Sequence, residues 1–137
     1  DLEKAQEERK QTTTLSNLIQ SLVNLCHKYI RERDKHKPCI SCGANWNEHF
    51  QAGHFYKAEL YSSLRFDELN INGQCRICNL HKDGNFQGYR EGFIKRYSAE
   101  QLEELETKAR DYKHQSFKWD REELKDKRLY YNNKLKE

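Results

Sequence analysis

The chain has 137 residues, of which 35% are hydrophobic and 34% are charged, a composition that excludes a large self-sufficient core. No apolar run approaches the roughly 18 residues that a bilayer-spanning helix needs, and no charged-then-apolar leader is present, so we expect a cytosolic protein with no membrane partner. The formal net charge is +3, and residues 31–97 carry all of this excess, which favours a polyanionic partner. Because the first residue is Asp1, we expect a fragment of a longer protein.

The first third of the chain predicts helices. Residues 1–11 are almost entirely polar and charged, which indicates a frayed or partner-dependent helix. After Thr12, Thr13 and Thr14, any of which could cap a helix, apolar residues recur at helical spacing as far as Ile30. A charged stretch and then Pro38 end this helix. Cys26 lies on its apolar side and is predicted to pack in the core.

The middle of the chain has a short, irregular pattern. Two strands are predicted, around His49 to Tyr56 and around Leu64 to Asp67, and the sequence turns helical again from Cys75. Aromatic residues at helical spacing follow the Asp83-Gly84 break and predict another helix.

Two capping boxes predict the last helices. Ser98 with Gln101 opens a helix through about Tyr112, and Asp120 with Glu123 opens the final one. The predicted fold is therefore α+β and mostly helical. It has an N-terminal helical arm at residues 1–37, a small zinc-stapled core of two strands and a helix at 38–97, and C-terminal helices at 98–137.

Four of the five cysteines form two close pairs, Cys39-x2-Cys42 and Cys75-x2-Cys78, separated by 32 residues. Each pair can direct two thiolates at one ion, and two pairs complete a tetrahedron. Reducing conditions in the cytosol disfavour disulfides, so metal ligation is the better interpretation. Four thiolates leave no open coordination position, and we therefore predict a structural Zn²⁺.

A histidine and an asparagine accompany these pairs. His54 lies on the first predicted strand, and Asn79 directly follows the last cysteine at the start of a predicted helix. This arrangement resembles the ββα-metal, or HNH, nuclease site, in which a histidine deprotonates water and a divalent ion such as Mg²⁺ or Mn²⁺ stabilises the phosphorane. The base must be neutral, so activity is expected to fall as pH drops through its pKa, near 6.5 if unperturbed.

Several motifs extend the resemblance beyond the site. They are Ile-Arg-Glu-Arg-Asp (30–34), Pro-Cys-Ile-Ser-Cys-Gly (38–43), Ala-Gly-His-Phe (52–55), Leu-Arg-Phe-Asp-Glu (64–68), Asn-Ile (70–71), Gln-Cys-x-x-Cys-Asn-x-His-Lys (74–82), Gly-Asn (84–85) and Tyr-Arg (89–90). Together they resemble the NinG/Rap family of lambdoid phages over residues 30 to 97. The resemblance implies a metal-dependent recombination endonuclease, acting in the bacterial host cell, that cuts branched DNA such as Holliday junctions and D-loops.

The chain departs from the HNH pattern at Gly53, where many of these nucleases carry an aspartate or histidine ligand. Candidate replacements are His81, Glu68, Asp67 and Asp83. Asp83 follows Asn79 by four residues and would share its helical face unless the Asp83-Gly84 break ends the helix first. His81 is equally a candidate for a DNA-phosphate contact.

Other residues of the matched motifs have supporting roles. Asn70 lies five residues before Cys75, as does the middle asparagine of many HNH motifs, and is expected to pin the loop between strand and helix. The candidate phosphate contacts are basic, and each could instead be a solvated surface charge. They are Arg65, Arg76, Lys82, Arg90, Lys95 and Arg96.

The leading hypothesis is a structure-selective DNA endonuclease with His54 as general base. Paired cuts in a symmetric junction favour a homodimer, with the helix at 15–33 and the apolar residues of the last helix as interface elements, unless these helices simply cover the zinc core. The alternative is a non-catalytic zinc module that binds branched DNA and recruits recombination proteins. A third hypothesis is a zinc-ribbon interaction domain with no DNA role.

Overall fold

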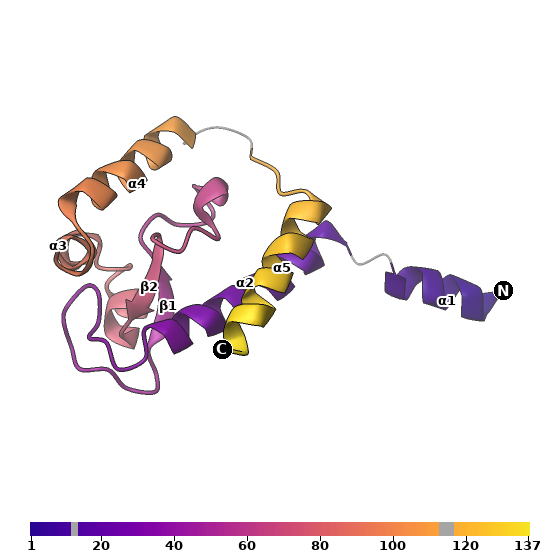
Figure 1. Ribbon diagram of the computed structural model, residues 1–137, viewed down its shortest axis with the longest axis horizontal. Helices are drawn as coiled ribbons and strands as arrows, with labels where there is room; N and C mark the ends of the chain where they lie inside the picture. The colour runs from indigo at the N-terminus through magenta and orange to yellow at the C-terminus, as the bar shows by residue number, and fades with distance from the viewer. Residues whose placement is uncertain (12–13, 113–116) are drawn as a thin grey trace.

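The computed structural model describes residues 1–11, 14–112 and 117–137. Two of the three candidate capping threonines, Thr12 and Thr13, lie outside these ranges. Within them, helices surround a two-stranded sheet (Figure 1). The elements are α1 (Leu2–Gln11), α2 (Leu15–Arg33), β1 (Gln51–His54), the 3-10 helix η1 (Ser62–Leu64), β2 (Ile71–Gln74), the π-helical turn η2 (Ile77–His81), α3 (Phe86–Arg96), α4 (Ala99–Tyr112) and α5 (Arg121–Leu135).

Helix α2 forms as its apolar spacing predicts. The Thr14 hydroxyl accepts a hydrogen bond from the Asn17 amide, which satisfies one of the unpaired donors at the helix start. Its apolar side packs along α5 (Figure 1) and against the sheet, and Cys26 is fully buried there, as predicted. This first hydrophobic cluster comprises Leu22, Cys26, Ile30, Ala52, Phe66, Ile71, Leu124 and Tyr131. The two helices therefore bury their apolar sides within the chain.

The sheet is an antiparallel hairpin in which Gln51 pairs with Gln74 and His54 with Ile71. The strand predicted at Leu64 to Asp67 is wrong. That segment begins with Leu64, the last residue of η1, and continues as a turn, and the second strand lies at Ile71–Gln74. The sequence Ile-Asn-Gly-Gln looks like a turn because Asn72 and Gly73 at its centre favour turns. All four are nonetheless buried, so packing and hydrogen bonds to distant residues determine this strand.

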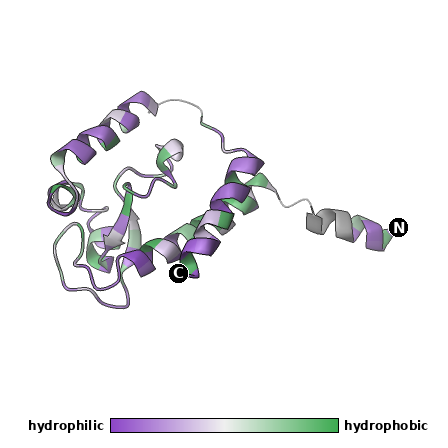
Figure 2. Ribbon diagram, viewed as in Figure 1, coloured by the Kyte–Doolittle hydropathy of each residue, from purple (hydrophilic) through white to green (hydrophobic). Residues whose placement is uncertain are grey.

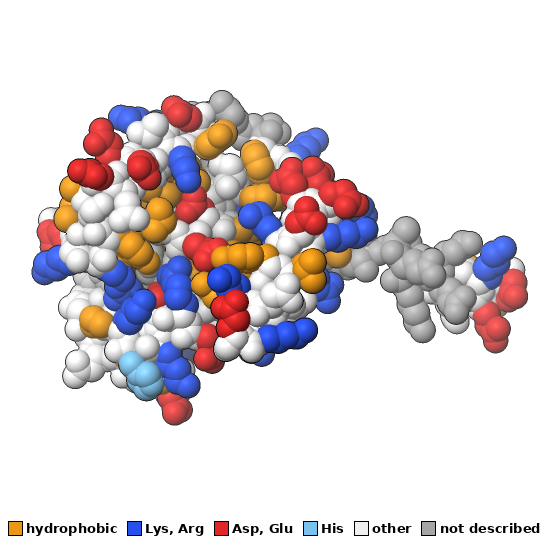
Figure 3. Space-filling view, viewed as in Figure 1, with side chains coloured by type: hydrophobic (Ala, Val, Ile, Leu, Met, Phe, Trp, Pro, Cys, Tyr) orange, Lys and Arg blue, Asp and Glu red, His pale blue; other side chains and the backbone are white. Residues whose placement is uncertain are grey.

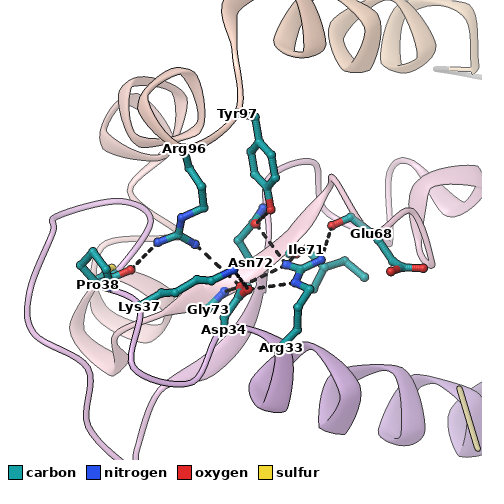
Figure 4. A network of polar contacts seen from close by, with 12 residues as sticks. Arg33, Asp34, Lys37, Pro38, Glu68, Ile71, Asn72, Gly73, Arg96 and Tyr97 are labelled. Atoms are coloured by element: carbon teal, nitrogen blue, oxygen red, sulfur yellow. Dashed lines mark hydrogen bonds and ion pairs between the residues drawn. The ribbon is translucent and has the colours of Figure 1, made fainter. Parts of the chain in front are cut away.

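A polar network on one side of β2 explains that burial (Figure 4). Arg33 forms a bidentate ion pair with Asp34, at 2.8 and 3.0 Å, and also donates to the Ile71 carbonyl oxygen. The Asp34 carboxylate accepts the Gly73 amide at 2.7 Å. Although burial opposes ionisation, Arg33 holds the pKa of Asp34 below its usual range. The Ile-Arg-Glu-Arg-Asp motif thus anchors the end of α2 to the second strand.

The same network reaches α3 and the residue before His54. The Asn72 amide donates to the Tyr89 hydroxyl at 3.1 Å, and that hydroxyl donates to the Gly53 carbonyl oxygen at 2.7 Å. Tyr97 donates to Asn72 Oδ1 at 2.6 Å. Tyr89 and Asn72 are fully buried. These bonds therefore connect the backbone of β1 to α3 and β2.

Helices α3 and α4 build the second hydrophobic cluster, which includes Tyr89 and Phe93 from α3 and Leu102 and Leu105 from α4. Both predicted capping boxes form in part: the Gln101 amide bonds to Ser98 Oγ, and the Glu123 amide bonds to Asp120 Oδ1. In Figure 2, hydrophilic residues predominate along α4 and α5 and hydrophobic ones recur at intervals. This pattern is that of amphipathic helices with one buried side.

A close approach brings α3 onto the first cysteine pair. A side chain at Gly92 would collide with the Ile40 carbonyl oxygen, and one at Gly88 with that of Ser41. Two glycines four residues apart therefore form a flat strip on α3 that lies against the backbone between Cys39 and Cys42.

Helix α1 stands apart from the other elements in Figure 1, beyond residues 12–13. None of the helices formed by the described residues is both long and apolar enough to cross a bilayer.

Candidate metal centre and histidine pocket

The two cysteine pairs meet at one point. The four sulfur atoms of Cys39, Cys42, Cys75 and Cys78 all lie within 4.8 Å of one another, and Cys42 Sγ lies 3.7 Å from Cys75 Sγ. Four sulfurs at about 2.3 Å from a tetrahedral Zn²⁺ are roughly 3.8 Å apart, so this cluster matches the geometry that the metal requires. The four cysteines could therefore hold a zinc ion.

Hydrogen bonds to the sulfurs support the same interpretation. The Cys75 amide points at Cys39 Sγ at 3.2 Å, and the Cys78 amide points at Cys75 Sγ at 3.4 Å. The Asn85 side-chain amide donates to Cys78 Sγ at 3.4 Å. Such donors stabilise thiolates, the form that binds metal. Gly43, at φ +76°, supplies the left-handed turn that follows the first pair.

Beside the cluster, β1 and the loop after it border a pocket of about 900 Å³, which we call the histidine pocket. It brings together His54, Asn79 and Asp83, three of the residues predicted from sequence, and adds His27 from α2. Residues far apart in the sequence thus converge on one concave surface. Such convergence is the usual arrangement of a binding or catalytic site.

The orientation of His54 is set by a hydrogen bond. Its Nε2 atom lies 3.0 Å from the Arg65 carbonyl oxygen. A carbonyl only accepts, so Nε2 carries the proton, and the lone pair of the neutral ring is on Nδ1. Burial lowers the pKa of His54 below its usual value of 6.5. The neutral form, which can accept a proton, therefore persists at a lower pH than it does in a free histidine side chain.

His27 is a neighbour that the sequence analysis missed. Its ring centroid lies 5.4 Å from that of His54. Burial lowers the pKa of His27 to about 4, so it is neutral at physiological pH. Its Nε2 atom is buried and has no hydrogen-bond partner among the described residues. The sequence feature that could have identified His27 is its position four residues after Val23, on the apolar side of the helix.

Asn79 is held in one orientation by the first strand. Its Nδ2 atom donates to Gln51 Oε1 at 2.6 Å, and its backbone amide bonds to the Cys75 carbonyl oxygen. No hydrogen bond to its Oδ1 atom occurs within the described part of the chain. This oxygen can therefore bind a metal ion, or contact a phosphate through a water molecule. The second cysteine pair therefore positions Asn79 directly.

Asp83 and His81 have different surroundings. The helical turn η2 ends at His81, so Asp83 does not continue one helical face with Asn79, and its backbone has φ +47°. Asp83 still lines the histidine pocket, where its carboxylate is 2.6 Å from Lys57 Nζ. His81 is exposed and is not among the residues that line this pocket.

The structure explains the glycine before His54. A Cβ atom at Gly53 would overlap Oε1 of Gln74, a fully buried side chain on β2. Gln74 Nε2 is fixed by bonds to Ser41 Oγ and to the Gly84 carbonyl oxygen, at 2.8 and 2.6 Å. The space that a ligand side chain would need at position 53 is therefore filled from the second strand.

The remaining acidic and amide candidates lie outside the pocket. Asn70 is fully buried, and its side chain bonds to both the amide and the carbonyl of Tyr56, so it pins the loop after β1. Asp67 pairs with Lys108 at 3.2 Å. Glu68 lies near Tyr29. The pKa of Tyr29 is raised mainly by burial and to a smaller extent by the Glu68 carboxylate. Neither carboxylate is brought to His54.

The six basic candidates do not share one surface. Arg65 lines the histidine pocket, whereas Arg76 and Lys82 lie beside the cysteine cluster. Arg90 pairs with Glu106, and Lys95 borders a groove along the first cysteine pair. Arg96 donates to the Pro38 carbonyl oxygen at 2.6 Å with a largely buried side chain, a structural contact. On the face shown in Figure 3, acidic side chains gather over α4 and the start of α5.

A two-stranded sheet among helices, with four cysteines that could bind a metal ion, defines a small, mostly helical α+β protein. The chain belongs to the NinG family: the family model described as "Bacteriophage Lambda NinG protein" matches residues 1–137.

Its curated relatives are phage proteins. It is 40% identical over 109 residues to Protein ninG of Escherichia phage lambda and of Salmonella phage P22, a match that covers 80% of this chain and 51% of each relative. The match to Protein ninG of Escherichia phage 933W has the same identity and covers 52% of that protein. The chain thus spans about half the length of these relatives. No solved structure matches this chain significantly.

Proposed function

We propose that this chain is the core of a metal-dependent, structure-selective DNA endonuclease that acts on branched recombination intermediates such as Holliday junctions and D-loops. The observation that carries the proposal is the setting of His54. Its Nε2 atom bonds to the Arg65 carbonyl oxygen, and its ring lines a pocket shared with Asn79 and Asp83. This setting supports a role for His54 as a general base.

In the proposed reaction, His54 Nδ1 takes a proton from a water molecule as the water oxygen attacks the phosphorus. The P–O bond to the leaving sugar oxygen breaks, and that oxygen is protonated by solvent. A divalent ion such as Mg²⁺ or Mn²⁺, when bound, supplies positive charge that neutralises the phosphate. The Asn79 amide oxygen and the Asp83 carboxylate are the oxygen ligands that this pocket offers.

The cysteine cluster has a different part in the proposal. With four sulfurs and no open position, it holds a structural Zn²⁺, which fixes Cys75 and Cys78 and hence Asn79 next to them. The tyrosine hydrogen bond to the Gly53 carbonyl oxygen fixes the other side of the site. The cysteines serve folding and His54 serves cleavage.

The test compares wild type with His54→Ala on a four-way junction and a D-loop, each with Mg²⁺ or Mn²⁺. We expect wild type to nick both substrates and His54→Ala to leave them intact. His49→Ala is the matched control, because His49 is exposed and lies beside the cysteine cluster rather than the histidine pocket. Equal nicking by wild type and His54→Ala would remove His54 as the base.

Two observations favour a second function, a zinc module that binds branched DNA and recruits recombination proteins without cutting. Gln74 fills the place of a ligand at Gly53, and Lys57 already neutralises Asp83. Metal titration separates the two functions. A nuclease binds a divalent ion in addition to zinc, and Asn79→Ala weakens that binding, whereas a binding module shows no second site.

A further inference from the structure

Aromatic rings gather at the edge of the histidine pocket, and none of them has a role in the proposed proton transfer. Phe55, Tyr56, Tyr61 and Phe86 all line this pocket, and we call them the aromatic ledge. Phe86 is the first residue of α3 and is 52% exposed. About half of this phenylalanine is therefore available to a ligand.

The ledge is held rigidly from behind. Phe55 is buried, and its ring centroid lies 4.6 Å from that of Phe86 and 4.9 Å from that of Tyr56. Tyr56 and Tyr61 meet edge to face at 4.9 Å. Buried Tyr89 packs against Phe55 from within the second hydrophobic cluster. An incoming planar group therefore meets a preorganised surface, which lowers the entropic cost of binding.

Positive charge lies beside these rings. Arg65 and Lys57 line the same pocket. The Lys57 side chain is 54% exposed and is paired with the Asp83 carboxylate at 2.6 Å, so a DNA phosphate would take the place of that carboxylate on Lys57. Lys57 directly follows Tyr56, and Arg65 supplies the carbonyl oxygen that orients His54. Aromatic rings interleaved with cations are the combination that binds single-stranded nucleic acid, because bases stack on the rings and phosphates contact the cations.

We propose that the aromatic ledge binds an unpaired DNA base, which stacks on Phe86. In continuous duplex each base is stacked between its neighbours and cannot reach the ring, whereas a base at a branch point can. Base capture at Phe86 would place the adjoining phosphate near Lys57 and His54. The ledge thus provides a physical basis for selecting branched DNA. The selection of branched DNA for cleavage rests on the proposed nuclease function, whereas base stacking at the ledge does not.

The test uses a forked duplex with 5-iododeoxyuridine at the first unpaired position, and the matching full duplex. The protein carries His54→Ala so that DNA stays intact. Ultraviolet light cross-links this base to stacked aromatic side chains, and peptide mass spectrometry identifies the residue. We expect the cross-link at Phe86 with the fork and none there with the duplex.

Three added variants make the result specific. Phe86→Leu keeps an apolar side chain without an aromatic face, and should lose the cross-link and bind the fork about 5- to 150-fold more weakly, with duplex affinity within about twofold. Phe86→Tyr keeps the face and should retain both. Tyr130→Leu, at another exposed aromatic residue on α5, should behave like its parent.

Two results would overturn the ledge proposal: a cross-link that maps elsewhere, or an equal loss of fork and duplex affinity in Phe86→Leu. If Phe86→Leu does not fold, the cross-linked residue in the parent protein still decides the matter. The nuclease proposal fails separately, through unchanged nicking by His54→Ala.

Discussion

The neutral histidine next to His54 leads to a quantitative prediction about stability and pH. Burial lowers the pKa of His27 to about 4, against an unfolded value near 6.5. The unfolded chain therefore binds this proton more readily than the folded chain. The stability that the neutral ring contributes is fully present above pH 6.5 and is lost as the pH falls from there towards 4.

The two pKa values set the size of the effect. When the pH falls from 7 to 5, proton binding by this one histidine in the unfolded chain lowers the unfolding free energy by about 2 kcal/mol. His27→Gln has no titrating ring at this position, so the pH dependence of its unfolding free energy should be about 2 kcal/mol smaller than that of wild type. Because both proteins keep the cysteine cluster, any acid release of zinc cancels in the comparison.

The assay is urea unfolding of wild type, His27→Gln and the exposed-site control His49→Gln, each at pH 7 and pH 5. We expect the control to lose as much stability on acidification as wild type. If His27→Gln loses as much as well, His27 is not a buried neutral histidine, and the account of the pocket as a desolvated pair of imidazoles is wrong.

The other predictions concern the metal, the hairpin and the base. Cys75→Ser should lose bound zinc and cooperative unfolding, measured by metal analysis and thermal melting; a fully stable metal-free variant would refute a structural zinc. Gly53→Asp should lower the unfolding free energy by about 1–3 kcal/mol, because the added Cβ overlaps Gln74. The same variant should not tighten Mn²⁺ binding. Tighter binding would show that position 53 can still carry a ligand. Tyr89→Phe removes the hydrogen bond to the Gly53 carbonyl oxygen and should cost about 1–2 kcal/mol with slower nicking; unchanged nicking would exclude Tyr89 as a positioning residue. Because burial lowers the pKa of His54, the nicking rate should fall on the acid side with a midpoint below 6.5, and a midpoint above 6.5 would contradict the buried neutral base.

Local pattern was enough to predict several parts of this structure. These parts are the apolar spacing of α2, the caps at Ser98 and Asp120, and the meeting of the two cysteine pairs. The sequence left three threonines as candidates for the α2 cap, and the structure places Thr14 there. Such features follow from helical periodicity and from the requirements of a tetrahedral ion.

The second strand could not be predicted in this way. Asn72 and Gly73 favour turns by themselves, and they form a strand because Asp34, Tyr89 and Tyr97 satisfy their polar groups from 17 to 39 residues away. Tertiary contacts override local preference here.

The same limit applies to the candidate site. The sequence showed that Gly53 lacks a ligand side chain, but only the structure shows that Gln74 occupies the space. His27 resembles a core residue of α2 until the pocket beside His54 is seen.

The proposed function requires that a neutral His54, held by the Arg65 carbonyl oxygen, activates water for DNA cleavage in this pocket. The most direct measurement is the nicking rate on a four-way junction with Mn²⁺ for wild type, His54→Ala and His49→Ala, with zinc content and melting temperature confirmed equal. The account predicts nicking by wild type and His49→Ala, and none by His54→Ala. Equal rates for all three proteins, or no nicking by wild type on any branched DNA, would contradict it.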